Sequence, residues 1–168
     1  MVQVGLLPKG EQVLSKLTGG AIVDVRAVCR TTSNKTGQKI KTARAVLQIE
    51  HTTTPPGSWV PDKATLTPLG QGFLKSLAKR MVKATRIRCD GHTALWAPSP
   101  VDATALSRAR ARLVCGKLRR KGVAVEINIV PHGNATPIAT NTTEAGRAIN
   151  RRVGITIIHP LAVRPPRK

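Results

Sequence analysis

Apolar and polar residues alternate along several segments of the chain, and this spacing predicts β-strands. In the segment 21–50 the alternation occurs twice, around turn-forming residues at 33–37, so the two strands form a hairpin. The same period of two recurs at 85–89, 123–129 and 153–158. We therefore expect a hairpin followed by three further strands.

Between these strands, apolar residues recur at the spacing of an α-helix. Thr67 can cap a helix that begins at Pro68 and ends near Val82. The apolar stripe of this helix consists of Leu69, Phe73, Leu74, Leu77, Ala78 and Met81. A second helix is expected over 102–120, with Asp102 or Thr104 as its cap, and a short third one over 143–150. Strands that alternate with helices predict a layered α/β (α+β) sandwich with a mixed sheet.

One residue interrupts the apolar face of the second helix. Leu106, Arg110, Val114 and Leu118 follow one another at intervals of four, which places a guanidinium in an otherwise apolar row. A buried arginine is costly unless an anionic group meets it, either a carboxylate of the chain or that of a ligand. Alternatively, the long side chain extends its charged end to water. The spacing alone leaves these alternatives open.

The charge of the chain predicts an anionic partner. The chain has 28 Lys and Arg against 8 Asp and Glu, a formal net charge of +20. Nucleic acid, teichoic acid, a phospholipid surface and ribosomal RNA all fit such a charge. The aromatic residues are only Phe73, Trp59 and Trp96, too few for a platform on which the bases of a single strand stack.

Several other kinds of site have no signal in the sequence. Cys29, Cys89 and Cys115 are far apart and form no CxxC motif, so we expect buried free thiols and no metal site. The apolar run at 4–7 is too short for a secretion signal, and no segment is long enough to span a membrane. No catalytic triad, carboxylate pair or phosphate loop is present, so we expect neither an enzyme nor a cofactor.

Three segments carry a family resemblance. Residues 106–118, which begin LSRARARLV, resemble the LSxxRAxxVxxxL helix of OmpA-like, peptidoglycan-associated domains. Residues 87–93 resemble the strand and turn that this family writes as IxxxGHTD, and residues 137–155 resemble its NPVAxNxTxxGRAxNRRVxI ending. Residues 62–78 are similar to the family's first helix. The likeness covers about 110 residues and implies a βαβαβ-type sheet with helices on one face.

The resemblance also implies a binding site. In this family the arginine of the LSxxRA helix and the aspartate of the GHTD turn hold the carboxylate and the amine of the diamino acid in the peptidoglycan stem. Arg110 matches the arginine, but Ala94 stands where the aspartate is expected, so we expect weakened binding. The remaining expected site residues are Thr93 with Asp90 or Asp102 as the frame of the pocket, and Arg151 as a brace of the binding loop. Trp96 is expected either to stack on a sugar ring or to cover the local core.

These observations lead to two functional hypotheses. The first is a non-catalytic module at the cell envelope that binds peptidoglycan or another anionic envelope polymer. The alternative is a structural subunit of a virion or an organellar ribosome, in contact with other subunits or RNA, that keeps the fold without the ligand. We expect a hairpin-bearing extension over 1–43, the OmpA-like domain over 44–160 and a basic, proline-rich tail over 161–168.

Overall fold

A computed structural model describes residues 13–18, 21–33, 36–81, 84–95, 101–119 and 126–161. The chain divides into two compact units, one made of Met1–Glu50 and Ile158–Lys168 and the other of His51–Ile157. The domain limits expected from the sequence, at 43/44 and 160/161, stay a prediction. Three expected positions lie outside the described residues: Val82 as the end of the first helix, Val123 as the start of a strand, and the loop residue Trp96. Of the tail predicted over 161–168, only Leu161 is described, and it is the last residue of a strand.

The first unit contains the predicted hairpin. Strands β2 (Ala21–Ser33) and β3 (Lys39–Thr53) are neighbours in the sheet, and Gly37 adopts a φ of 79° in the turn between them. On the other side of β2 lies β1 (Val13–Thr18), which is antiparallel to β2 and has Thr18 opposite Ala21. Strand β1 was not predicted, because its sequence VLSKLT does not alternate apolar and polar residues.

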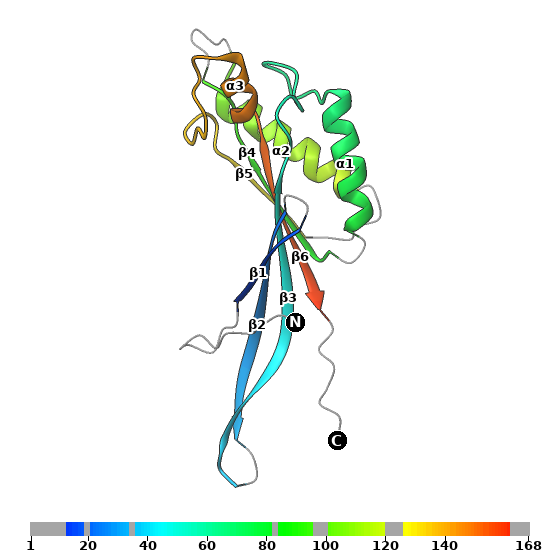
Figure 1. Cartoon of the computed structure of the whole chain (residues 1–168), viewed down its shortest axis with the longest axis vertical. Helices are drawn as coiled ribbons and strands as arrows, with labels where there is room; N and C mark the ends of the chain where they lie inside the picture. The colour runs from blue at the N-terminus through cyan, green and yellow to red at the C-terminus, as the bar shows by residue number, and fades with distance from the viewer. Residues whose placement is uncertain are drawn as a thin grey trace. The chain divides into compact units, whose positions relative to one another are not determined.

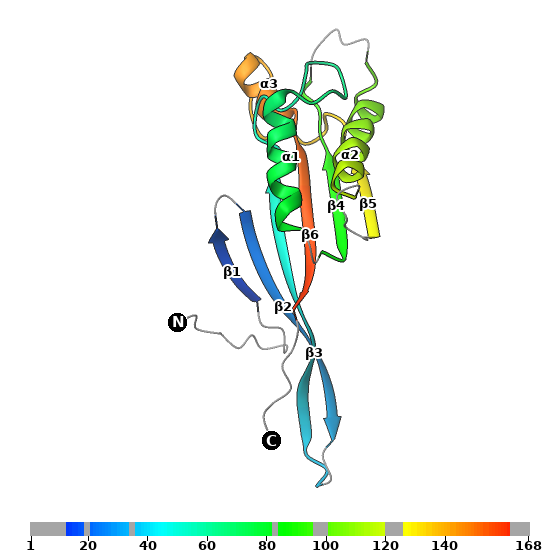
Figure 2. The same ribbon diagram turned by 90° about the vertical axis from the view of Figure 1, so that its right-hand side faces the viewer.

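The second unit contains the mixed sheet that the sequence predicts. The end of β3 is followed by β6 (Val153–Leu161), β4 (Arg86–Gly91) and β5 (Glu126–Pro131), in that order (Figure 2). Strands β4 and β5 are parallel, with Arg86 opposite Glu126. The backbone N–H of His92 donates to the carbonyl of Arg152 at 2.9 Å, so the end of β4 lies beside the start of β6 and these two strands are antiparallel.

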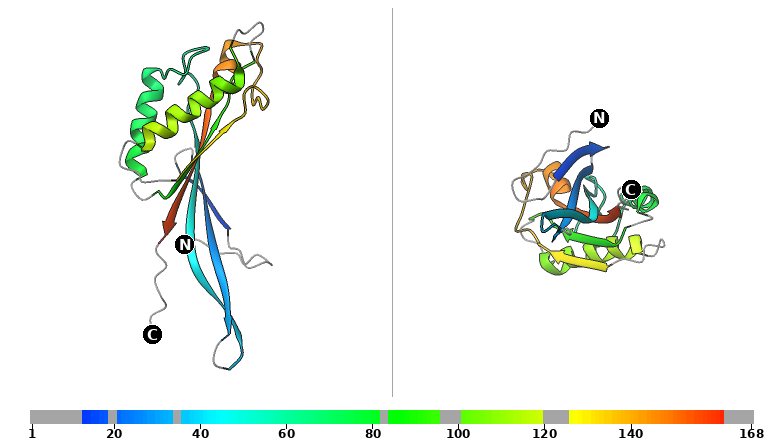
Figure 3. Two further views of the ribbon diagram at one scale, coloured as in Figure 1. Left: turned by 180° about the vertical axis from the view of Figure 1, so that it is seen from behind. Right: turned by 90° about the horizontal axis from the view of Figure 1, so that it is seen from below.

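Three helices complete this unit, and their limits lie within two residues of the predicted ones. They are α1 (Pro68–Arg80), α2 (Ala103–Arg119) and α3 (Glu144–Asn150). Helices α1 and α2 lie on one face of the sheet (Figure 1), and α2 packs against β4 and β5 (Figure 3). The Thr67 hydroxyl accepts from the N–H of Gly70 at 3.3 Å, and the Asp102 carboxylate accepts from the N–H of Thr104 at 2.8 Å. Both residues are therefore the caps that the sequence predicted.

The core lies between the helices and the sheet. Ile87 and Cys89 of β4 point into it while Arg86 and Arg88 are exposed, as the alternation predicted. The other core side chains include Leu74, Leu77, Met81, Val114, Leu118, Val153, Ile155 and Ile157. The predicted stripe of α1 is wrong at its first member, since Leu69 is 54% exposed. The buried side of α1 centres on Leu74, Leu77 and Ala78, and Leu69 lies beyond its edge.

The expectation of free thiols is wrong for two of the cysteines. Cys89 of β4 and Cys115 of α2 are fully buried, as expected, but they form a disulfide whose Cα atoms are 6.2 Å apart. The pairing depends on how α2 lies over β4, which the spacing of cysteines along the chain does not reveal. For Cys29 the free thiol stays a prediction.

Two glycines allow backbone segments to come unusually close. A Cβ atom on Gly91, at the end of β4, would lie 2.0 Å from the carbonyl oxygen of Ser107 in α2. A Cβ atom on Gly146, in α3, would lie 2.0 Å from the carbonyl oxygen of Thr140. Any side chain at either position would push the two segments apart. These contacts bring α2 close to the end of β4 and α3 close to the loop before it.

Candidate functional site

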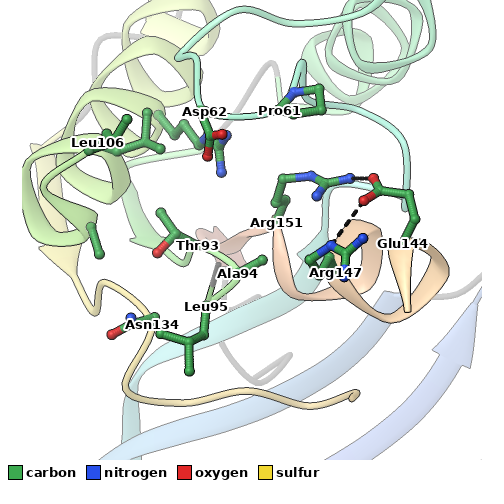
Figure 4. Close-up of a pocket in the computed structure, with 13 residues that line it drawn as sticks. Pro61, Asp62, Thr93, Ala94, Leu95, Leu106, Asn134, Glu144, Arg147 and Arg151 are labelled. Atoms are coloured by element: carbon green, nitrogen blue, oxygen red, sulfur yellow. Dashed lines mark hydrogen bonds and ion pairs between the residues drawn. The ribbon is translucent and has the colours of Figure 1, made fainter. Parts of the chain in front are cut away.

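A pocket of about 390 Å³ opens in the second unit where several loops and helix ends meet. The turn before α1, the segment after β4, the start of α2, the turn after β5 and α3 all contribute to it (Figure 4). The lining consists of Pro61, Asp62, Thr93, Ala94, Leu95, Val101, Ala103, Leu106, Arg110, Asn134, Glu144, Arg147 and Arg151. The pocket therefore brings together Arg110, Thr93 and Arg151 of the residues expected from the sequence.

Arg110 lines this pocket and is fully buried. Its Nε and Nη2 donate to the carbonyl oxygen of Lys63 at 3.1 and 3.0 Å, and Nη2 also donates to that of Val60 at 3.3 Å. Its Cζ atom lies 5.2 Å from the ring centroid of Trp59, within the range of a cation–π interaction. The partners of this arginine within the chain are thus backbone carbonyls, where the sequence suggested a carboxylate or water.

The guanidinium keeps its charge at neutral pH. Burial and the nearby charge of Arg151 lower the pKa of Arg110 to about 10, while the carboxylate of Asp62 acts in the opposite direction. An Arg pKa near 10 leaves the group protonated at pH 7. A buried positive charge with only neutral hydrogen-bond partners attracts an anion into the pocket.

Two polar atoms next to the pocket lack a partner among the described residues. They are Nη1 of Arg110 and Oγ1 of Thr93, and both are buried. Thr93 itself is held in place, because its backbone N–H donates to the carbonyl of Gly133 at 2.8 Å. Buried polar groups are almost always hydrogen-bonded in folded proteins. A bound ligand is one way to satisfy the guanidinium N–H groups and the hydroxyl that the protein leaves unpaired.

A second charged group lies on the α3 side of the pocket. Glu144 accepts from Nη2 of Arg151 and, at 3.0 Å, from Nε of Arg147, as the dashed lines in Figure 4 show. The hydrogen bond from Arg151, helped by Arg147, lowers the pKa of Glu144. Nη1 of Arg147 also donates to the carbonyl of Asn141 at 2.9 Å. Arg147 and Arg151 thus hold both a carboxylate and a loop in place.

The loop before α3 is fixed to the rest of the pocket through two asparagines. The Asn150 side chain is fully buried, accepts from the N–H groups of Ile138 and Ala139, and donates to Oδ1 of Asn141 at 2.9 Å. Oδ1 of Asn141 in turn accepts from the backbone N–H of Leu95 at 3.1 Å. Residues of the GRAxNRR segment therefore support the pocket edge that contains Leu95.

The start of α2 is fixed to the turn after β5 in a similar way. Ser107 is fully buried, donates to the carbonyl of Thr104 at 2.9 Å and accepts from the N–H of Gly133 at 3.0 Å. The carbonyl of Gly133 is the group that holds Thr93. The serine of the LSxxRA segment is thus a structural residue that positions the pocket wall.

Two of the expected site residues, Asp90 and Asp102, do not line the pocket. Asp90 forms an ion pair with Arg88 at 2.7 Å and a hydrogen bond with Nε2 of His132 at 2.9 Å. Burial opposes the charge of Asp90, but these two partners outweigh it and lower the pKa of Asp90. Asp102 is occupied by the cap of α2. Trp96 lies outside the described residues. Neither aspartate is therefore placed to supply the carboxylate that the family's GHTD turn has at the position of Ala94.

Several pocket residues were not expected from the sequence, above all Asp62 and Glu144. Asp62 belongs to a turn far from Arg110 along the chain, and no local pattern connects the two. Glu144 has the appearance of an ordinary acidic residue in the first turn of a helix. Over the described part of the chain, no three His, Cys, Asp or Glu side chains form a cluster suited to a metal, and no helix is both long and apolar enough to cross a membrane.

A family comparison agrees with this geometry. Residues 59–151, which contain every described residue that lines the pocket, match the model of the OmpA family. The chain belongs to the OmpA family. The resemblance seen in the sequence is thereby confirmed, and so is the fold class.

Individual OmpA-family relatives match the same part of the chain. Outer membrane porin F of Pseudomonas fluorescens is 39% identical over 99 residues, which cover 57% of this chain and 30% of the porin. The peptidoglycan-binding protein ArfA of Mycobacterium tuberculosis is 34% identical over 99 residues, again 57% of this chain and 30% of ArfA. The chain thus spans about a third of the length of these relatives.

Solved structures with the OmpA-like fold are also similar. The periplasmic domain of Helicobacter pylori MotB superposes with a TM-score of 0.52 at 19% identity, covering 69% of this chain and 80% of the domain. The cell wall anchor of the T6SS from Pseudomonas aeruginosa gives a TM-score of 0.52 at 22% identity, with 78% and 87% covered. At these identities the likeness concerns the fold.

Proposed function

We propose that this chain is a non-catalytic module that binds the stem peptide of peptidoglycan in the pocket around Arg110. The observation that carries the proposal is the pair of unpaired polar atoms, Nη1 of Arg110 and Oγ1 of Thr93, beside a pocket of about 390 Å³. A ligand carboxylate accepts from Nη1 in a charge-assisted hydrogen bond, and Oγ1 of Thr93 donates to the same ligand. Among the described residues that line the pocket there is no Ser, Cys or His, and the carboxylate of Glu144 is held by Arg147 and Arg151.

Relatives and the disulfide support a location at the cell envelope. One relative is named a peptidoglycan-binding protein, and a similar structure is named a cell wall anchor. Disulfides persist in oxidising compartments such as the periplasm and the cell exterior, and Cys89 and Cys115 form one here. We therefore place the second unit where it faces the cell wall.

The outer surfaces of the two long helices add electrostatic attraction to an anionic envelope polymer. The sequences of α1 and α2 contain no Asp or Glu. Their exposed cationic residues are Lys75, Lys79, Arg80, Arg108, Arg112, Lys117 and Arg119. Attraction by such a surface acts over long range and weakens as salt is added. We expect this contribution to disappear at high ionic strength, while binding in the pocket remains.

Sedimentation with purified sacculi tests the proposal. The full chain is expected to sediment with sacculi, and Arg110→Ala to lose most of this binding at a salt concentration that screens surface charge. Arg86→Ala is the control, because it removes the same charge from an exposed side chain of β4 outside the pocket. No sedimentation of the unaltered chain, or equal sedimentation of both variants, would refute the proposed function.

Thr93→Val separates binding from folding. Valine has the shape of threonine, and Oγ1 makes no hydrogen bond within the described structure, so the free energy of unfolding is expected to stay the same or rise. Loss of the hydroxyl should weaken binding about two- to tenfold, the size of one neutral hydrogen bond. Unaltered binding by Thr93→Val would count against a ligand contact at this residue.

The alternative of a structural subunit rests on Ala94. The pocket has alanine at the position where the family resemblance leads one to expect the aspartate, and Ala94 lines the pocket directly. A chain that no longer binds peptidoglycan would not sediment with sacculi. It would instead co-purify with the other subunits of an assembly. Affinity purification of the tagged chain from its host is the measurement that detects such subunits.

A further inference from the structure

A second cavity, of about 300 Å³, lies on the outer side of α2. The residues that line it are Asp102, Thr104, Ala105, Arg108, Ala109 and Arg112, and none of them lines the pocket around Arg110. Arg110 is fully buried, whereas Arg108 and Arg112 are exposed, so the two cavities lie on different sides of the same helix. The outer cavity is therefore separate from the site described above.

The two arginines of this outer cavity have no partner within the chain. Neither Arg108 nor Arg112 forms a hydrogen bond or an ion pair with any residue that the structure describes. They are four residues apart, which places them on successive turns of α2, about 6 Å apart along its axis. Most other arginines of the second unit differ, and those paired with a carboxylate are Arg86, Arg88, Arg147 and Arg151. Two neighbouring guanidinium groups thus remain available to one ligand.

The carboxylate at this cavity does not neutralise the arginines. Oδ1 of Asp102 accepts from the backbone N–H groups of Thr104 and Ala105, at 2.8 and 3.1 Å, and Asp102 forms no ion pair with Arg108 or Arg112. The helix itself contains no Asp or Glu. Two cations therefore face one carboxylate that already caps the helix, and the cavity favours an anion.

The chemistry of the lining indicates which anion fits. A planar guanidinium fork matches the paired oxygens of a phosphate, and two forks on one helix face can hold the same group. The remaining side chains, Thr104, Ala105 and Ala109, include no ring on which a nucleic-acid base could stack. They also include no large apolar group to enter a bilayer, and the exposed large hydrophobic residues lie elsewhere, at Leu69, Leu95, Ile138 and Ile149. A phosphodiester on a small backbone fits best.

We propose that Arg108 and Arg112 form a phosphate-binding site for a polyol-phosphate polymer of the cell wall. The proposal goes beyond diffuse attraction by basic helices, because it assigns the contact to two residues and to phosphate in preference to other anions. It rests on the proposed function for the location at the wall, but it uses no residue of the pocket around Arg110. The Cys89–Cys115 disulfide supports a compartment outside the cytosol, where such polymers occur.

Binding of a labelled synthetic poly(glycerol phosphate) to the full chain, followed by fluorescence anisotropy, tests the site. The double variant Arg108→Gln with Arg112→Gln is expected to weaken the affinity about tenfold or more, through loss of two charge-assisted contacts. Lys75→Gln with Lys79→Gln is the matched control, because these residues are also exposed, also four apart on a helix and outside the cavity. The control should weaken binding about threefold at most. Equal weakening by both double variants would show non-specific attraction only and would overturn the proposal.

Two further comparisons separate phosphate recognition from charge. Arg108→Lys with Arg112→Lys retains the charge but loses the planar forks, so it should still weaken binding about three- to tenfold. Polyglutamate with the same number of charges should bind more weakly than poly(glycerol phosphate). Unaltered affinity of the lysine variant, or equal binding of the two polymers, would overturn the proposal. Tighter binding of a single-stranded oligonucleotide with the same number of phosphates would overturn the assignment to a wall polymer.

Sacculi with and without their phosphate polymers distinguish this proposal from the proposed function. Hydrofluoric acid removes polyol phosphates from sacculi and leaves the peptidoglycan. The Arg108→Gln with Arg112→Gln variant should sediment less with untreated sacculi and normally with stripped ones, whereas Arg110→Ala should sediment less with both. If the double variant matches the unaltered chain on untreated sacculi, this proposal fails and the proposed function stands. If the unaltered chain sediments only with untreated sacculi, the proposed function fails and this proposal stands.

Discussion

The guanidinium of Arg110 holds the backbone carbonyl of Lys63 through two N–H groups, at 3.1 Å from Nε and 3.0 Å from Nη2. This contact joins the middle of α2 to the turn before α1. It gives the buried arginine a structural role in addition to the proposed role in binding. Its effects on stability and on ligand affinity must therefore be measured separately.

Arg110→Lys is expected to destabilise the fold. A lysine ammonium is a single point of charge and cannot reproduce the planar fork that reaches the carbonyls of Val60 and Lys63 and keeps Nη1 available. We expect a loss of about 2 to 4 kcal/mol in the free energy of unfolding, measured by urea denaturation. Arg112→Lys, two residues away in α2 and exposed, should change it by less than about 0.5 kcal/mol. Equal effects of the two variants would contradict the role of Arg110 in holding the turn.

Gly91→Ala is expected to be strongly destabilising. Its Cβ atom would lie 2.0 Å from the carbonyl oxygen of Ser107, and neither backbone segment can move without separating α2 from β4. The loss in the free energy of unfolding should be about 3 kcal/mol or more. Gly116→Ala is the matched comparison, because nothing lies within 4 Å of its Cβ position in α2. That variant should gain about 0.5 to 1 kcal/mol from better helix propensity. A small loss for Gly91→Ala would mean that the close contact is not required.

Reduction of the Cys89–Cys115 disulfide is expected to lower the free energy of unfolding while the fold is retained. Cys89 and Cys115 are separated by 26 residues, and closing a loop of this length stabilises a protein by about 3 kcal/mol in the chain-entropy model. The denaturation midpoint of the oxidised chain should therefore fall when a reductant is added. Alkylation in denaturant, followed by mass spectrometry, should label two fewer cysteines without reductant than with it. Equal labelling under both conditions would show that the bond is not formed.

Acid is expected to destabilise the protein through His92. Burial, together with the positive charges of Arg152 and His132, lowers the pKa of His92 from 6.5 to about 4. Because the folded state disfavours the protonated form, this stabilisation is complete above about pH 6.5 and declines as the pH falls toward 4. A shift of that size corresponds to at most about 3 kcal/mol.

His92→Gln isolates this contribution. Glutamine can retain a hydrogen bond to the Thr136 hydroxyl, which lies 2.8 Å from Nδ1 of His92, but it does not titrate. The free energy of unfolding, measured by urea denaturation between pH 7 and pH 4, should decline less steeply for this variant than for the unaltered chain. Parallel profiles would show that another group causes the loss in acid.

Local regularities explain why the elements could be predicted. The alternation of Ile87 and Cys89 with Arg86 and Arg88 predicts a strand with one buried face, and Ile87 and Cys89 are indeed buried. Thr67 and Pro68 mark the start of α1, and both occupy the predicted positions. These patterns involve residues that are close together in the chain, so they can be recognised without knowledge of the tertiary structure. Strand β1 has no such regularity and was missed.

The sequence by itself determined the order of the helices and of every strand except β1, the family, and the position of a cation, Arg110, in an otherwise apolar helical row, because each follows from spacing or motif within a short segment. Only the tertiary structure decided what that cation meets. It places the carbonyls of Val60 and Lys63 and the carboxylate of Asp62 around α2, and it joins Cys89 to Cys115. These contacts bring together residues from separate elements. Their distances depend on how α2 lies on the sheet and how the turn before α1 closes, and no periodicity along the chain encodes either arrangement.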